Sequence, residues 1–229
     1  MSSLVSLESK IGYVFVDKAL LTRAVTHRSF ASKNNERLEF LGDSILGQIV
    51  AEYLFLSFEE ATEGQLSRAR ASIVKEPTLA RIARKLHLGN YLKLGGGELK
   101  SGGFNRDSIL ADALEAVLGA VYLDSGFEKA KEFVNTHFSE EFANANPGSL
   151  QKDPKTRLQE FLQQNGLDLP LYEVTGISGA SHEQQFTVLC TIPSHDISLV
   201  GTGSSKRKAE QSSASLALDS ISKTPGTNG

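Results

Sequence analysis

The sequence predicts a multidomain protein: an all-α domain over residues 1–143, then a small α+β domain over residues 153–222 with the order α-β-β-β-α. Apolar residues recur at helical spacing in the first part, and from residue 172 their period changes to two, which is typical of strands. Residues 144–152 have the Asn-, Pro- and Gly-containing composition of a linker. We expect residues 223–229 to form a disordered tail.

The first domain is predicted to consist of helices that begin at residues 4, 36, 62, 77, 108 and 127. Gly12 and Tyr13 divide the first of them, residues 4–25, into two short helices. Thr62 and Gln65 have the spacing of a capping box, and Pro77 suits a first helical position. The glycine-rich residues 89–104 are predicted to be an ordered loop.

The second domain is predicted to begin with a helix that Asp153 caps and Gly166 closes. Three short strands follow, over residues 172–177, 186–192 and 197–200, and the closing helix covers residues 206–221. A single helix–sheet core of this size is close to the minimum for an independent domain.

Composition narrows the class of protein. The 229 residues carry a net charge of −3, with −2 in residues 1–150 and −1 in residues 151–229, so any polyanion must bind at local clusters. The single cysteine, Cys190, excludes an intrachain disulfide and fits a reducing compartment. The sequence has no long apolar run and no secretory signal pattern. We therefore expect a cytoplasmic protein with no membrane partner.

An acidic helix is the most informative segment. Glu36, Glu39 and Asp43 are spaced by three and four residues, so they lie within about 60° of each other on one helical face. No lysine or arginine shares that face to relieve their repulsion. A divalent metal such as Mg²⁺, which prefers carboxylate oxygens, is one counter-charge. The alternative interpretation is a solvated acidic face.

A second acidic pair favours the metal. Asp112 and Glu115 are three residues apart within the strongly apolar helical stretch 108–121. Because unpaired buried charge is costly, these acids are poorly explained as solubilising residues. Two acidic helices facing each other would form a site of hard oxygen ligands, the type that supports metal-assisted phosphodiester hydrolysis.

Other motifs are less specific. The glycine-rich segment lacks the Gly-Lys of a P-loop and the preceding strand of a dinucleotide-binding motif, so no nucleotide cofactor is expected. His27 is either a hydrogen-bonded structural residue, which we favour, or a ligand. Lys206, Arg207 and Lys208 open the last helix, just after a Gly- and Ser-rich turn, where a phosphate could bind. The alternative for this cluster is a solvated basic face.

Several motifs, in this order, resemble those of the bacterial ribonuclease III family. They are Thr-His-Arg-Ser at 26–29, Asn-Glu-Arg-Leu-Glu-Phe-Leu-Gly-Asp-Ser at 35–44, Glu-Gly and Leu-Ser at 63–67, glycines at 95–103, and Ser-Ile-Leu-Ala-Asp-Ala-Leu-Glu-Ala at 108–116. Residues 153–221 are similar to the double-stranded-RNA-binding domain of that family. The resemblance covers nearly the whole chain.

The resemblance implies a homodimeric endoribonuclease that cleaves double-stranded RNA to 5′-phosphate and 3′-hydroxyl ends. It implies roles in the processing of ribosomal RNA precursors and in the processing or decay of other structured RNAs. By analogy, Mg²⁺, for which Mn²⁺ can substitute, is bound by Glu39, Asp112 and Glu115. Asp43 and Glu115 are implied to be catalytic, and Glu36 and Glu63 to have substrate or dimer roles.

The implied RNA contacts of the second domain are Thr156, Gln159, Glu160, His182, Lys206, Arg207 and Lys208. Asn105 departs from the family pattern, in which we expected a basic residue. A bound metal would lower the pKa of a water molecule, and its carboxylate ligands must be ionised, so activity should fall at acid pH. The competing hypotheses are a catalytically silent duplex-RNA-binding protein and a protein-interaction module with an acidic face.

Overall fold

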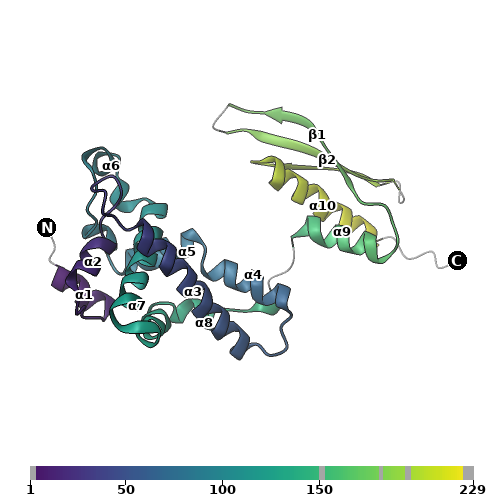
Figure 1. The fold of residues 1–229 in the computed structure, drawn as a ribbon. Coiled ribbons are helices and arrows are strands. Elements are labelled where there is room, and N and C mark those ends of the chain that lie inside the picture. The colour runs from purple at the N-terminus through teal and green to yellow at the C-terminus, as the bar shows by residue number, and fades with distance from the viewer. Residues whose placement is uncertain (1–3, 150–152, 181–182, 194–196, 224–229) are drawn as a thin grey trace. The chain divides into compact units, whose positions relative to one another are not determined.

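The computed structural model describes residues 4–149, 153–180, 183–193 and 197–223. The chain divides into two compact units, residues 1–150 and 151–229, which are described separately (Figure 1). The fold class predicted from the sequence is confirmed, because the first unit is helical and the second has the order α-β-β-β-α. The predicted disordered tail and His182 lie outside the described residues, apart from residue 223, which ends the last helix.

The first unit contains the helices α1 (Leu4–Ile11), α2 (Lys18–Ala24), α3 (Glu36–Ser57), α4 (Glu63–Ile73), α5 (Glu76–Lys85), η1 (Leu88–Asn90), α6 (Gly96–Lys100), η2 (Gly103–Asn105), α7 (Asp107–His137), α8 (Ser139–Ala143) and η3 (Pro147–Ser149). The predicted capping box of α4 is present in full: the Thr62 side chain accepts from the Gln65 backbone, and the Gln65 side chain accepts from the Thr62 backbone. This reciprocal pair satisfies two N–H groups that a helix start would leave without partners.

The structure corrects the expected glycine-rich loop and part of the expected linker, and it bears out the break after residue 126. The glycine-rich stretch expected as a loop contains α6 and the short turns η1 and η2, and Gly102, with a φ of 77°, allows the chain to turn between α6 and η2. The division expected between the helices from residues 108 and 127 is confirmed: they are the two halves of α7, which is interrupted at Gly126, where φ is 81° and ψ is −174°. Glycine adopts this left-handed backbone without steric cost, so the chain bends there. Part of the expected linker, residues 147–149, forms η3, which contacts α4.

The core of the first unit is the crossing of α3 and α7. A Cβ atom added at Gly42 would lie 1.8 Å from the backbone oxygen of Glu115, and one added at Gly119 would lie 2.3 Å from the backbone oxygen of Leu38. These two glycines therefore allow the helix backbones to touch. Within the described residues, α3 is long and apolar enough to span a membrane by length and composition alone. Its buried side chains, such as Leu46, belong to this core.

The second unit consists of α9 (Pro154–Gln164), β1 (Leu171–Ser178), β2 (Gln185–Ile192), β3 (Ile197–Gly203) and α10 (Lys206–Lys223). The strands form an antiparallel sheet in the order β1-β2-β3, with Cys190 opposite Tyr172 on one side and Leu199 on the other. One face of the sheet is covered by α9 and α10, as Figure 1 shows. Their shared core includes Leu158, Leu162 and the buried Cys190.

Candidate metal centre and nucleic-acid interface

The α3–α7 crossing positions three of the predicted acids. Glu39 lies in the first turns of α3, and Asp112 and Glu115 lie in the first half of α7. One ligand oxygen from each carboxylate can be chosen so that all three lie within 4.8 Å of one another. Each of the three residues is half-buried. Because Gly42 packs on the Glu115 backbone one turn after Glu39, the closest helix contact sits directly at the acid cluster.

Burial and neighbouring carboxylates raise the pKa of each acid in the cluster. Burial is the largest cause of a rise in the pKa of Glu115 to about 8. The charges of neighbouring carboxylates contribute the remainder, in the order Asp43, Asp112 and Glu39. Burial and then the Asp112 charge also raise the pKa of Glu39. A divalent cation would oppose each of these effects.

The pKa of Asp112 is also raised, mainly by burial and then by the charge of Glu76 at the start of α5. His27 and Arg28 act in the opposite direction, because a positive charge on either side chain favours the ionised carboxylate. Sequence reasoning did not place Glu76 or Arg28 near this cluster. Neither residue shares a helix with the acids, so no spacing rule could have brought them together.

Two other predicted acids lie around the cluster. Asp43 is exposed one turn beyond Glu39 on α3, and its charge acts on Glu115. Glu36 begins α3 and lines a cavity of about 530 Å³ together with Glu39 and Asp112. Its carboxylate accepts a hydrogen bond from the Asn34 side chain at 3.0 Å and pairs with Arg28 at 3.4 Å. The structure thus brings Glu36 to the edge of the acid cluster.

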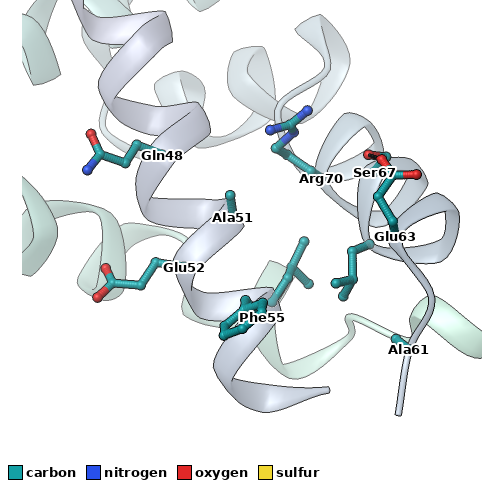
Figure 2. Close-up of a pocket in the computed structure, with 10 residues that line it drawn as sticks. Gln48, Ala51, Glu52, Phe55, Ala61, Glu63, Ser67 and Arg70 are labelled. Carbon is teal, nitrogen blue, oxygen red and sulfur yellow. Dashed lines mark hydrogen bonds between the residues drawn. The ribbon is translucent and has the colours of Figure 1, made fainter. Parts of the chain in front are cut away.

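Glu63 lies elsewhere. It begins α4 and lines an apolar cavity of about 770 Å³ between α3 and α4, where it accepts a hydrogen bond from Ser67 at 2.6 Å (Figure 2). Ala51 and Phe55 of α3 line the opposite side of this cavity in Figure 2. The family resemblance implies a substrate or dimer role for Glu63, which within one chain lies apart from the three-carboxylate cluster.

The structure explains why an asparagine, and not a basic residue, occupies position 105. Arg84 of α5 donates from Nε to the Asn105 side-chain oxygen at 3.0 Å and from Nη2 to its backbone oxygen at 2.7 Å. The same guanidinium pairs with Asp107 at the start of α7. A basic residue at position 105 would lie beside Arg84, whereas asparagine accepts its hydrogen bond. The nearby Arg106 instead lines the cavity beside Glu39 and pairs with Glu98.

In the second unit, the starts of α9 and α10 share a cavity of about 560 Å³. Thr156, Gln159, Lys206 and Arg207 line it, which brings together four of the predicted RNA contacts. The carboxylate of Asp153 accepts hydrogen bonds from the Thr156 backbone at 3.1 Å and from its hydroxyl at 2.9 Å, which fixes the start of α9.

The other predicted RNA contacts are not among the residues that line this cavity. Lys208 is exposed one residue beyond Arg207 and donates to Ser204 Oγ at 3.1 Å, and Glu160 is half-buried on α9. His182 lies outside the described residues. The glycines before α10 have a packing role that we had not expected: Cβ atoms at Gly201 and Gly203 would lie 2.2 Å and 2.6 Å from the α10 backbone. Their place before the basic cluster is therefore explained by close strand–helix packing.

An all-α unit with a three-carboxylate cluster, followed by an α-β-β-β-α unit with cations at a helix start, is the arrangement expected of a metal-dependent nuclease of duplex RNA. Comparison with known proteins agrees. Residues 17–142 match the family model described as Ribonuclease-III-like, and residues 154–221 match that of the double-stranded RNA binding motif. The chain belongs to the ribonuclease III family and is an endoribonuclease that acts on double-stranded RNA.

Individual relatives cover almost the whole chain. "Ribonuclease 3" of Hahella chejuensis is 57% identical over 93% of this chain and 94% of its own length, and that of Vibrio parahaemolyticus is 54% identical over 94% and 96%. The solved nuclease domain of ribonuclease III from Campylobacter jejuni is 45% identical, with a TM-score of 0.61 over 64% of this chain and all of its own. A second structure of that domain is described as flexible in a region involved in dimer formation. Membership of this family implies the use of a divalent metal ion.

Proposed function

We propose that Glu39, Asp112 and Glu115 bind Mg²⁺, with Mn²⁺ able to substitute, and that this centre hydrolyses one strand of duplex RNA. The single observation that carries the proposal is the convergence of three half-buried carboxylates within 4.8 Å. The donor set consists of oxygen atoms alone, which suits a hard cation. When bound, such an ion lowers the pKa of a water molecule and stabilises charge on the leaving 3′-oxygen. The expected products carry 5′-phosphate and 3′-hydroxyl ends.

The surrounding residues then have distinct tasks. Asp43 is exposed and makes no hydrogen bond or ion pair with the described residues, so its carboxylate is available to accept a proton from the attacking water. We therefore assign Asp43 and Glu115 as the catalytic acids. Glu36, which is held by Asn34 at the cavity edge, orders the approach to the site. The cations Arg28 and Arg106 line the same cavity and favour a phosphate backbone there.

The second unit would hold the duplex. Thr156, Gln159 and Glu160 on α9, with His182, are assigned to 2′-hydroxyl and base-edge contacts in minor grooves. Lys206, Arg207 and Lys208 are assigned to phosphates of the intervening major groove, where the start of α10 adds its own dipole. The shared cavity at the starts of both helices supports a common binding face. Recognition of this kind depends on A-form shape rather than on sequence.

A homodimer is the proposed assembly, and the apolar cavity between α3 and α4 is its proposed contact. Phe55 and its neighbour Leu56 at the end of α3 are 69% and 65% exposed, and Phe40 near its start is 77% exposed. Phe55 also lines the cavity (Figure 2). Exposed apolar patches beside a cavity mark interaction surfaces. The place of Glu63 in this cavity favours the dimer role among the two considered for it.

In the cell, we infer a cytoplasmic enzyme that processes ribosomal RNA precursors and processes or degrades other structured RNAs, as family membership suggests. A catalytically silent binding protein is the second candidate function. The presence of Glu39, Asp43, Asp112 and Glu115 at the sites described argues against it, because silent relatives would be expected to have lost one or more of these acids.

The experiment that tests the proposal compares wild type, Glu115→Gln and the control Glu60→Gln on a long RNA duplex. Glu60 is an exposed acid in the turn before α4. Cleavage and gel-shift binding are both scored, in Mg²⁺ and in EDTA. We expect wild type and the control to cut only with Mg²⁺, and Glu115→Gln to bind without cutting. A wild-type protein that binds duplex RNA but never cuts it would overturn the catalytic assignments together.

A further inference from the structure

His27 lies in a segment that the backbone holds firmly. Its N–H donates to the Lys93 carbonyl at 3.0 Å, and the Lys93 N–H donates to the Val25 carbonyl at 2.8 Å. Thr26 and Lys93 form an isolated parallel bridge, and the Thr26 carbonyl accepts from Asn35 just before α3. These contacts connect the His27 segment to both the start of the acidic helix and the loop before α6. These hydrogen bonds therefore fix the position of the His27 backbone, from which the imidazole extends.

The ring itself is oriented by one neighbour. His27 Nδ1 accepts the Ser29 backbone N–H at 3.2 Å and lies 2.8 Å from Ser29 Oγ. A backbone N–H can only donate, so Nδ1 must present its lone pair to Ser29, and the Ser29 hydroxyl, whose oxygen accepts the Gly95 N–H at 3.0 Å, is placed to donate to Nδ1 as well. A Cβ at position 95 would lie 2.3 Å from the Ser29 carbonyl, so this contact requires glycine. With Nδ1 acting as an acceptor, the proton of the neutral ring is on Nε2.

Within the described part of the chain, the remaining ring nitrogen, Nε2, has no hydrogen-bond partner. The half-buried side chain lines the cavity of about 530 Å³ that also contains Glu39, Asp112, Arg28 and Arg106. Nε2 carries a hydrogen in the neutral ring and in the imidazolium, so it is a donor in either state. An oriented donor therefore stands beside two of the proposed metal ligands.

We propose that His27 is a positioning residue that donates a hydrogen bond from Nε2 to a non-bridging phosphate oxygen of the RNA strand in this cavity. The two arginines in the same wall favour an anionic acceptor, and the RNA backbone supplies one at every nucleotide. The contact would fix the strand so that the scissile phosphate meets the acid cluster. This inference rests on the catalytic assignment of Glu39, Asp112 and Glu115.

Three substitutions separate this role from a purely structural one. His27→Gln places an N–H group close to the position of Nε2, whereas His27→Asn retains an acceptor close to the position of Nδ1. His27→Ala removes both. Because a hydrogen bond to a charged group contributes about 10- to 100-fold, we expect Asn and Ala to slow single-turnover cleavage by that factor. Gln should stay within about threefold of wild type, and His87→Asn, which alters an exposed histidine outside this cavity, should match wild type.

The contact can also be located on the RNA. In duplexes with a single methylphosphonate near the cut, one position should slow wild type and Gln but leave Ala unaffected, since Ala has already lost the contact. In a Glu115→Gln background, His27→Ala should weaken duplex binding in the absence of cleavage. Full activity of His27→Asn with a slow His27→Gln would overturn the proposal in favour of a structural role, as would an equal response of wild type and Ala at every methylphosphonate. If Glu115→Gln itself cuts normally, the catalytic assignment of Glu115 fails. The methylphosphonate comparison of wild type with His27→Ala still tests the His27 contact, because it does not depend on that assignment.

Discussion

Glu115→Gln should make the metal-free protein more stable, although the residue is proposed to be essential for cleavage. In the folded chain the pKa of Glu115 is about 8, against an ordinary value of 4.5. Between these values the folded state holds a proton that the unfolded state has released. The free energy of unfolding therefore falls as pH rises from about 4.5 to about 8. A neutral glutamine avoids that loss.

The size of the effect follows from the shift. One pKa unit corresponds to about 1.4 kcal/mol, so the full shift amounts to about 5 kcal/mol above pH 8 and about 3 kcal/mol at pH 7. Solvent reaches the half-buried cluster and screens these charges, and the repulsion is distributed over three carboxylates. The expected gain in the free energy of unfolding of the glutamine variant is therefore smaller, about 1–3 kcal/mol. For a chain of this length that is a rise of about 3–10 °C in Tm.

Thermal unfolding in EDTA at pH 5.5 and pH 8.5 measures this gain, with Glu60→Gln as the matched control. The difference between Glu115→Gln and wild type should be small at pH 5.5 and largest at pH 8.5. Saturating Mg²⁺ should then raise the Tm of wild type and reduce the difference, because a ligand stabilises only the state that binds it. A Glu115→Gln variant that is no more stable than wild type in EDTA at pH 8.5 would refute the reasoning.

Three further predictions concern the helix crossing, the duplex-binding face and the dimer. Gly42→Ala should destabilise the first unit by about 3 kcal/mol or more, since its Cβ would overlap the Glu115 backbone. Gly47 lies on the same helix with open space around it, so Gly47→Ala should be neutral or stabilising in the same melting experiment. Lys208→Ala should weaken binding of all duplexes alike and reduce the slope of log K against log salt by roughly one unit, as measured by anisotropy titrations; an unchanged slope would leave the cluster a solvated face. Ala51→Asp should place a charge in the apolar cavity and yield a monomer by light scattering, and a variant as dimeric as wild type would locate the interface elsewhere.

The elements and their acidic faces could be predicted from sequence because both depend on local spacing. Glu36, Glu39 and Asp43 share a face through helical periodicity, and Asp112 and Glu115 do so for the same reason. The break at Gly126 was also predicted from the sequence, in which a new helix was expected to begin at residue 127. These features require only the geometry of one helix at a time.

What the sequence could not provide is the arrangement of helices relative to each other. The approach of α3 and α7 depends on Gly42 and Gly119 lying opposite backbone atoms of the other helix, which no single-helix pattern reveals. Spacing within one helix also does not show how α4 lies relative to α3 and α7. The sequence therefore did not reveal that Glu63 lies in a separate cavity, away from the other predicted acids. His27 was favoured as a structural histidine, and its Nδ1 bonds agree, but the unpartnered Nε2 emerged only with the cavity around it.

We propose above all that the three converging carboxylates form one metal centre. Mn²⁺ titration followed by electron paramagnetic resonance, in the absence of RNA, tests it most directly. We predict that wild type and Glu60→Gln bind Mn²⁺ equally, and that Glu39→Gln, Asp112→Asn and Glu115→Gln each bind it at least about tenfold more weakly, as expected for the loss of one ligand. Three variants that bind Mn²⁺ as tightly as wild type would contradict the account.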